Sequence, residues 1–214
     1  MSKNKNIFII GLFAITIGII GGYYYFTPST IDPTIPENVV DMSYSQWVHS
    51  TNTARASFDF WESDPSVVLL YDRESSLSIS ATLTFSDIAI GKIKLQMRTL
   101  STEYNGQMYI DFKKGNSVVF SIIRDSSGGY TFKVNRSLSN LGIHDLEITN
   151  FYIEWNFDTR LVKISAERQE NFRYTVNLYT VIESIDNIKI YTTYSTFNSG
   201  TLFFFENSYL TWTE

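Results

Sequence analysis

The sequence contains no cysteine and only two histidines, His49 and His144. The absence of cysteine excludes disulfides, thiolate zinc sites and thiol nucleophiles. Two imidazoles supply too few of the three or four ligands that a zinc site needs, and no G-x-S-x-G motif points to a serine hydrolase. Neither histidine is therefore expected to carry chemistry.

Basic residues and prolines are also scarce. The chain has 17 Lys and Arg against 22 Asp and Glu, a formal net charge of -5. No basic patch is present, so a nucleic acid is not an expected partner. Three of the 4 prolines, Pro28, Pro33 and Pro36, fall in residues 27–41. Proline fixes φ and lacks an N–H donor, so this segment is predicted to be an extended stalk.

Residues 7–26 contain no charge at all. At 1.5 Å per residue such a run spans the roughly 30 Å hydrocarbon core of a bilayer. Lys3 and Lys5 precede it, which predicts a cytoplasmic end at residues 1–6 and an extracellular domain at residues 42–214. A cleaved signal peptide is the alternative, but its apolar region is shorter and ends at a small-residue cleavage site. We expect a single-pass protein of the cell membrane, held by an uncleaved signal anchor.

What the chain has in abundance is aromatic residues, at 16%, and apolar side chains that alternate with polar ones. Such a period of two, with turn signals at "YNG", "KKGN", "SSGG" and "NSG", predicts an all-β, antiparallel two-sheet sandwich. Residues 136–147 are the only candidate for a short helix or loop. The alternating apolar positions include Ile79, Ala81, Leu83, Ile93, Leu95, Met97, Met108, Ile110, Phe112, Tyr130, Phe132, Val134, Ile188 and Ile190.

The clearest alternation lies in residues 150–167, "NFYIEWNFDTRLVKISAE". Trp155 shares a face with Phe151, while Glu154 and Asp158 share the opposite face. We expect the Trp155 face to line the core and the two acids to be solvated.

Five stretches resemble the concanavalin A-like lectin/glucanase superfamily, the laminin-G-like jelly roll, over roughly residues 55–214. The resemblance implies a jelly-roll sandwich whose last strand returns beside its first. It is carried by "ASFDFWESDPSVVLLYD", "IAIGKIKLQMRTL", "GQMYIDFKKGNSVVFSIIRDSSGGYTFKV", "FYIEWNFDTRLVKISAE" and "IDNIKIYTTYSTFNSGTLFFFENSYLTW".

The resemblance also implies two kinds of site. Sugars stack on exposed aromatic rings in such folds, although Tyr191 could instead simply top its sheet and Phe197 fold onto the core. Many such domains also bind calcium through Asp, Asn and carbonyl oxygens. The sugar candidates are Tyr191, Tyr194, Phe197 and Asn198, and the calcium candidates are Asp158, Asp186 and Asn187. Separately, Asn135 begins an N-x-S match and is a candidate glycosylation site.

Glycoside hydrolysis needs two carboxylates about 5–9.5 Å apart. The superfamily's glucanases carry a Glu-x-Asp-x-(x)-Glu run, which this sequence lacks. Its nearest acids are a cluster at residues 59–64 and the pair Glu154 and Asp158, which are about 13 Å apart along an extended strand. We therefore expect a non-catalytic domain for recognition or adhesion, with a glycan or a surface protein as partner. The alternatives are a structural subunit of a surface layer or pilus-like filament, and a degenerate glycoside hydrolase.

Overall fold

The computed structural model describes residues 38–53, 56–62, 64–72, 78–99, 106–135, 137–144, 148–166, 174–193 and 200–213. The expected anchor and most of the expected stalk lie outside this part. Within the described ranges, no helix has the length and apolar character needed to span a bilayer. Residues Pro36–Glu214 form one structural unit.

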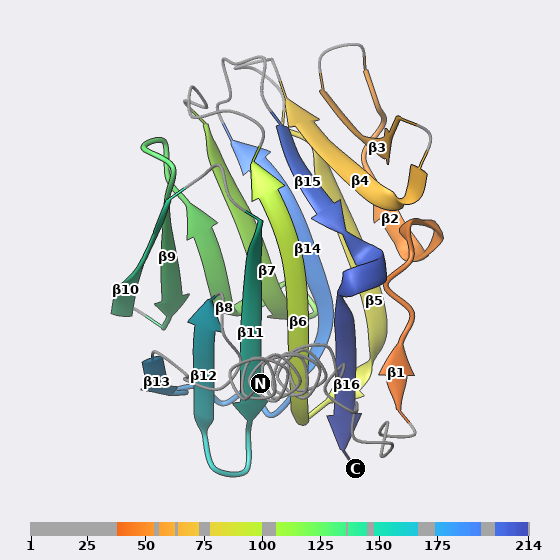
Figure 1. Cartoon of the computed structure of the whole chain (residues 1–214). Coiled ribbons are helices and arrows are strands. Elements are labelled where there is room, and N and C mark those ends of the chain that lie inside the picture. Colours follow the sequence, from red (N-terminus) through yellow and green to blue (C-terminus); the bar gives the residue numbers. More distant parts are fainter. Residues whose placement is uncertain are drawn as a thin grey trace, which may run out of the picture. The chain divides into compact units, whose positions relative to one another are not determined.

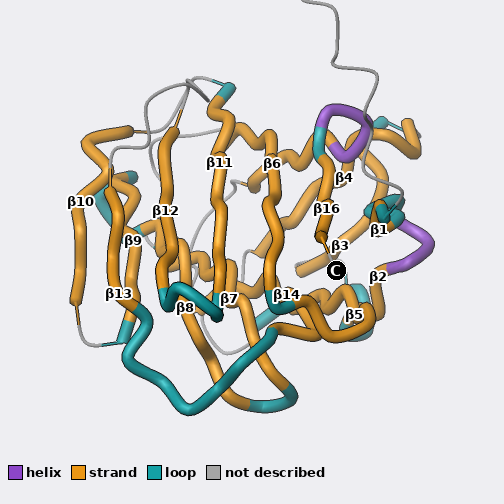
Figure 2. Tube along the Cα trace, turned by 90° about the horizontal axis from the view of Figure 1, so that it is seen from below, coloured by secondary structure: helices purple, strands orange, loops and turns teal. Residues whose placement is uncertain are grey.

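Two antiparallel sheets pack face to face and form the two layers seen in Figures 1 and 2. The first, sheet A, has the order β13-β12-β11-β6-β15-β4-β3, and β16 pairs with both β6 and β1. Its strands are β1 (Val39–Val40), β3 (Ala56–Trp61), β4 (Asp64–Asp72), β6 (Ile90–Thr99), β11 (Thr149–Asn156), β12 (Leu161–Ala166), β13 (Tyr174–Asn177), β15 (Gly200–Phe204) and β16 (Tyr209–Thr213).

The second, sheet B, has the order β10-β9-β8-β7-β14-β5-β2. The only helices in the described ranges are two short 3-10 turns, η1 (Tyr44–Gln46) and η2 (Phe205–Asn207). The predicted all-β antiparallel sandwich is therefore confirmed. The strands of sheet B are β2 (Trp47–His49), β5 (Ser80–Ile88), β7 (Gln107–Lys114), β8 (Ser117–Arg124), β9 (Gly129–Val134), β10 (Ser137–His144) and β14 (Ile185–Thr193).

Trp155 on β11 lies at the centre of the core between the sheets, as predicted. Its side chain is 1% exposed, and its ring centroid lies 6.1 Å from those of Phe112 and Phe120 on the facing sheet. The indole Nε1 donates to the carbonyl of Ile88 at 3.3 Å. Gly91 makes room for the ring, because a Cβ added there would lie 2.5 Å from Trp155 Cζ2.

The last two strands share one position beside β6. β15 pairs with its C-terminal part and β16 with its N-terminal part, and η2 separates them. Phe205 of η2 stacks on Trp47 with centroids 5.3 Å apart. β1 pairs with β16, so the first and last strands lie side by side as the resemblance implied. Val39 and Val40 thus join the sheet inside the range expected to be stalk.

The expectation of a helix or loop near residues 136–147 is wrong for most of that segment. Residues Ser137–His144 form β10, which pairs with β9 at the edge of sheet B. The register shifts between Asn140 and His144, and Gly142 there has φ +66°. This irregularity breaks the alternation and hides the strand from a period-two pattern.

Candidate functional site

The outer face of sheet B carries two stacked tyrosines at its centre. Tyr191 of β14 and Tyr109 of β7 are register partners, and their rings are parallel within 6°, with centroids 4.9 Å apart. Their sequence neighbours Ile190 and Ile110 are fully buried in the core, so alternation directs both tyrosines outward. The Lys189 ammonium lies 5.2 Å from the centroid of the Tyr191 ring.

A buried carboxylate supports this pair. Asp111 is only 4% exposed although it lies on the outer face. It accepts a hydrogen bond from Ser121 Oγ at 2.6 Å and another from the Tyr191 hydroxyl. Hydrogen bonds of this kind offset the free-energy cost of removing a carboxylate from water. We call Tyr109, Asp111, Ser121, Lys189 and Tyr191 together the tyrosine face.

The tyrosine hydroxyls remain neutral across the physiological pH range. Burial raises the pKa of Tyr191, and the nearby charge of Asp111 and the hydrogen bond to it raise it further. Burial and the Asp111 charge also raise the pKa of Tyr109. Because both values lie above the ordinary 10, each phenol keeps its proton and can donate a hydrogen bond.

Two further polar groups border the tyrosine face. The Tyr109 hydroxyl donates to Gln107 Oε1 at 2.7 Å. Thr193 pairs with Gln107, and its hydroxyl is buried without a hydrogen-bond partner. A buried, unsatisfied hydroxyl is unfavourable.

The sequence candidates for sugar binding meet different outcomes. Tyr191 lies on the tyrosine face, whereas Tyr194, Phe197 and Asn198 lie outside the described residues. Sequence reasoning missed Tyr109 and Asp111. Their outward position was readable from the alternation in "QMYIDF", but the pairing of β7 with β14 was not.

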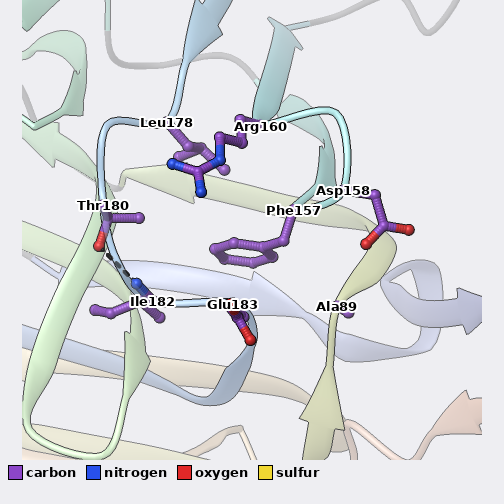
Figure 3. Close-up of a pocket in the computed structure, with 8 residues that line it drawn as sticks. All are labelled: Ala89, Phe157, Asp158, Arg160, Leu178, Thr180, Ile182 and Glu183. Carbon is purple, nitrogen blue, oxygen red and sulfur yellow. Dashed lines mark hydrogen bonds between the residues drawn. The ribbon is translucent and has the colours of Figure 1, made fainter.

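A separate pocket of about 370 Å³ lies where three turns meet at one end of the sandwich (Figure 3). We call it the end pocket. Phe157 and Leu178, which are 7% and 1% exposed, give it an apolar lining. Its remaining lining residues are Ala89, Asp158, Arg160, Thr180, Ile182 and Glu183.

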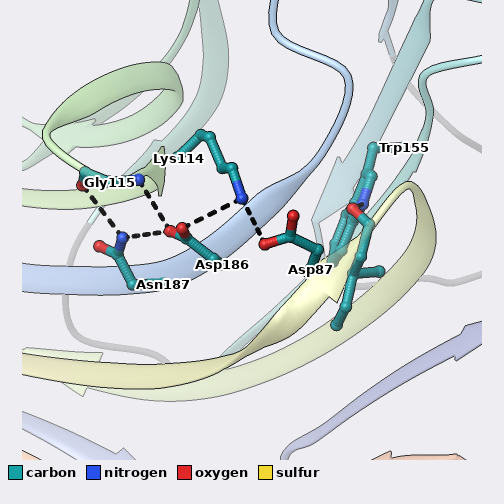
Figure 4. A network of polar contacts seen from close by, with 7 residues as sticks. Asp87, Lys114, Gly115, Trp155, Asp186 and Asn187 are labelled. Atoms are coloured by element: carbon teal, nitrogen blue, oxygen red, sulfur yellow. Dashed lines mark hydrogen bonds and ion pairs between the residues drawn. The ribbon is translucent and has the colours of Figure 1, made fainter.

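The calcium candidates are divided between two places. Asp158 lines the end pocket, whereas Asp186 and Asn187 belong to a hydrogen-bonded network with Lys114 and Gly115 (Figure 4). Asp186 Oδ1 accepts from the Gly115 amide at 2.9 Å and from Asn187 Nδ2 at 2.6 Å, while its Oδ2 lies 3.4 Å from Lys114 Nζ. The Lys114 ammonium is shared between this carboxylate and that of Asp87, its nearer partner, so it offsets only part of their combined charge. Within the described ranges no group of three or more acids or histidines could hold a metal, so calcium binding stays a prediction.

The Asp186 network predicts a pH-dependent contribution to stability. Burial raises the pKa of Asp186, but hydrogen bonds from Gly115 and Asn187 and the Lys114 charge outweigh it, and the net shift is downward. A lowered folded-state pKa stabilises the protein above the unfolded value and loses that effect as pH falls through the folded one. Asp186→Asn should therefore cost under about 1 kcal/mol at pH 7, after allowance for solvent screening, and less at about pH 3, below the ordinary pKa of the carboxyl.

Urea unfolding at both pH values measures this difference, with Asp158→Asn as an exposed control. An equal cost at both would show that the amide hydrogen bonds, rather than the charge, stabilise this corner.

The remaining acids and the glycosylation candidate from the sequence analysis take part in local hydrogen bonds or ion pairs. Asp64 accepts from the Ser66 amide and hydroxyl, which lower its pKa. Glu154 forms an exposed ion pair with Lys163 at 3.6 Å. Asn135 is exposed, with φ +53°, and its Nδ2 donates to the Asn177 carbonyl at 3.1 Å; its glycosylation stays a prediction.

The histidines also hold structural positions. His49 Nδ1 bonds to the Ser50 carbonyl at 2.9 Å, and its Nε2 lies 3.0 Å from the Tyr44 hydroxyl. His144 was expected in a loop, but its backbone ends β10 and pairs with Gly129.

No protein-family model and no curated protein matches the sequence. Solved structures do match. A sialidase is similar with a TM-score of 0.69 and 11% identity over 83% of this chain, which spans only 19% of that protein's length. The Ca²⁺-bound exoplasmic/lumenal domain of VIP36 has a TM-score of 0.57 and 7% identity over 79% of this chain and 84% of its own.

An alginate lyase, AlyC3, in complex with dimannuronate is also similar, with a TM-score of 0.53 and 9% identity over 69% of this chain and 76% of its own. Identities this low show the fold alone. One fold is indicated by the sheet order, by the adjacent first and last strands, and by the likeness to these solved structures. The domain is a concanavalin A-like jelly-roll sandwich.

Proposed function

We propose that this chain is a cell-surface protein that binds glycans along the tyrosine face and does not catalyse their cleavage. The observation that carries the proposal is the outward pair of Tyr109 and Tyr191 beside the buried carboxylate of Asp111. Aromatic rings offer apolar surface to the C–H faces of sugars, and a few fixed polar groups then orient the hydroxyls. The phenol protons already go to Asp111 and Gln107, so toward a sugar hydroxyl the two phenol oxygens act as acceptors.

The layout of this face suits a chain of sugars rather than a single one. A continuous row of register partners crosses five strands, from Thr82 through Lys189, Asp111 and Ser121 to Lys133. Neighbouring strands are about 4.8 Å apart, so the row is about 19 Å long. Asp111 and Ser121 in the middle of the row are buried, so the side chains around them would supply the contacts to successive sugar rings.

The charges along the row favour acidic sugars. Lys113, Lys133 and Lys189 face outward around Asp111, although the whole chain has a net charge of -5. Ammonium groups attract carboxylate or sulfate substituents, most strongly at low salt. The alginate lyase was solved with dimannuronate, an acidic saccharide, which makes uronate polymers a sensible first ligand to test.

The location of the protein is part of the proposal. Residues 7–26 would anchor the chain in the cell membrane, with Lys3 and Lys5 on the cytoplasmic side. The stalk would then hold the sandwich outside the cell, where glycans are available for recognition or adhesion. Protease protection of the domain in intact cells would contradict this orientation.

Titration calorimetry with uronate, mannose and β-glucose oligosaccharides tests the binding. Tyr191→Ala should weaken the best ligand about tenfold, because an aromatic contact contributes about 0.5–1.5 kcal/mol and 1.4 kcal/mol is tenfold. Tyr152→Ala is the matched control, since Tyr152 is a half-buried tyrosine on the outer face of sheet A. Equal losses from both variants, or no binding by any of the three, would contradict the proposal.

A further inference from the structure

Hydrogen bonds donated by backbone amides hold the segments that line the end pocket. The Phe157 amide donates to the Ala89 carbonyl at 3.1 Å, and the Leu178 amide donates to the Arg160 carbonyl at 2.8 Å. The Ile182 amide donates to Thr180 Oγ1 at 3.1 Å. These bonds tie the β5–β6 turn, the β11–β12 turn and the segment between β13 and β14 together, so the pocket is a preformed feature.

Arg160 occupies a position that favours glycine. Its φ is +56°, in the left-handed region, which is unfavourable for a residue with a Cβ. Its backbone donates to the Phe157 carbonyl at 3.2 Å and accepts from Leu178, and a glycine could make both bonds. An unfavourable backbone conformation retained at a pocket points to a task for the side chain. In Figure 3 the Arg160 side chain runs in the direction of Leu178, with the Phe157 ring below it.

The charges around that ring are of both signs. Arg160 contributes a planar guanidinium, which matches carboxylate and phosphate groups bidentately. Asp158 and Glu183 contribute carboxylates elsewhere on the lining, and the Phe157 ring lies among the three (Figure 3). Carboxylates together with an aromatic face suit an ammonium group. A ligand with only one sign of charge would meet repulsion on one side of the pocket.

We propose that the end pocket is a second binding site, independent of the tyrosine face, for a small zwitterion. Its ammonium group lies between Asp158 and Glu183, and its phosphate or carboxylate group binds Arg160. Phosphoethanolamine has this chemistry, either free or as a lipid headgroup. A volume of about 370 Å³ accommodates a molecule of this size.

The position of the pocket bears on the lipid source. Asn38, the first described residue, accepts a hydrogen bond from the Trp212 amide, and Trp212 pairs with Gly91, close to Ala89 of the pocket. The chain therefore enters the sandwich at the end that carries the pocket. Tyr179 and Val181, which are 77% and 96% exposed, lie in the same segment as the lining residues. Exposed apolar side chains of this kind suit a membrane interface.

Calorimetry on the full-length chain tests the proposal with O-phosphoethanolamine, ethanolamine and inorganic phosphate. We expect O-phosphoethanolamine to bind about tenfold or more tightly than either single-charge fragment. Arg160→Gly should weaken it about tenfold while leaving the melting temperature equal or higher, because glycine relieves the backbone conformation. Glu183→Gln should weaken ethanolamine and O-phosphoethanolamine alike. Competition by phosphatidylethanolamine vesicles, but not by phosphatidylglycerol vesicles, would identify the lipid headgroup as the source.

Three results would overturn the proposal. These are equal affinity for a fragment and for O-phosphoethanolamine, unchanged affinity in a folded Arg160→Gly variant, and no binding at about 10 mM ligand. The Arg160→Gly variant should bind saccharides with the same affinity as the parent protein. A failure of the end-pocket proposal can therefore be told apart from a failure of the tyrosine-face proposal.

Discussion

Replacing Trp155 with alanine is expected to lower the free energy of unfolding by about 3–5 kcal/mol. The indole is 1% exposed, contacts rings from the opposite sheet, and donates its N–H to the Ile88 carbonyl. Its removal leaves both a cavity between the sheets and an unpaired carbonyl. Urea unfolding followed by circular dichroism measures the change. Since small domains are stable by only about 5–15 kcal/mol, the variant should be close to its threshold for folding.

The neighbouring residue provides the control. Glu154 is 40% exposed in its side chain and pairs with Lys163, which is similarly exposed. Solvent screens such a pair, so Glu154→Ala should change stability by at most about 0.5 kcal/mol. If the two substitutions had similar effects, the assignment of the Trp155 side as the core and the Glu154 side as solvent would be wrong.

Gly91→Ala is expected to cost about 1–3 kcal/mol, although it adds a single methyl group. The new Cβ would lie 2.5 Å from Trp155 Cζ2 and 2.8 Å from Ile88 Cγ2, distances that real Cβ atoms do not show. The indole is packed on its other side by Phe112 and Phe120, so it has little room to retreat.

A double-mutant cycle separates this clash from any backbone effect of the glycine. In the Trp155→Ala background the clash with the indole is gone, and the cavity gives Ile88 Cγ2, the remaining close atom, room to move away from the new methyl group. Gly91→Ala should then cost little or nothing, with a coupling energy of about 1–3 kcal/mol between the two sites. Additive losses would instead show that Gly91 is needed for its backbone conformation.

The sandwich was predictable because burial in a two-sheet fold follows a local rule. Trp155 and Ile153 alternate with Glu154, and each falls on the side that its polarity requires. The same rule failed at residues 137–144, because Gly142 and the register shift interrupt the alternation. Edge strands tolerate such irregularity, since only one neighbour constrains them.

The candidate sites were harder to predict because they depend on which strands become neighbours. Tyr191 was a candidate from its position, but its stacking on Tyr109 follows from a pairing between distant segments. Asp158 was expected to be merely solvated, and it is exposed. The pocket it lines is completed by Leu178 and Glu183 from a segment that no short-range pattern connects to it. The membrane anchor stays a prediction, because it lies outside the described residues.

The short pairing of β1 with β16 has a mechanical consequence. Only Val39 and Val40 pair there, with Thr211 and Leu210, before the chain continues to β2 in the other sheet. Tension applied to the chain ahead of Asn38 acts on this short ladder first. Its few hydrogen bonds open one after another, while the buried ring of Trp47 continues to hold the next segment against Phe205. The domain therefore has, at its N-terminal entry, a few residues that would lengthen under load before the core is strained.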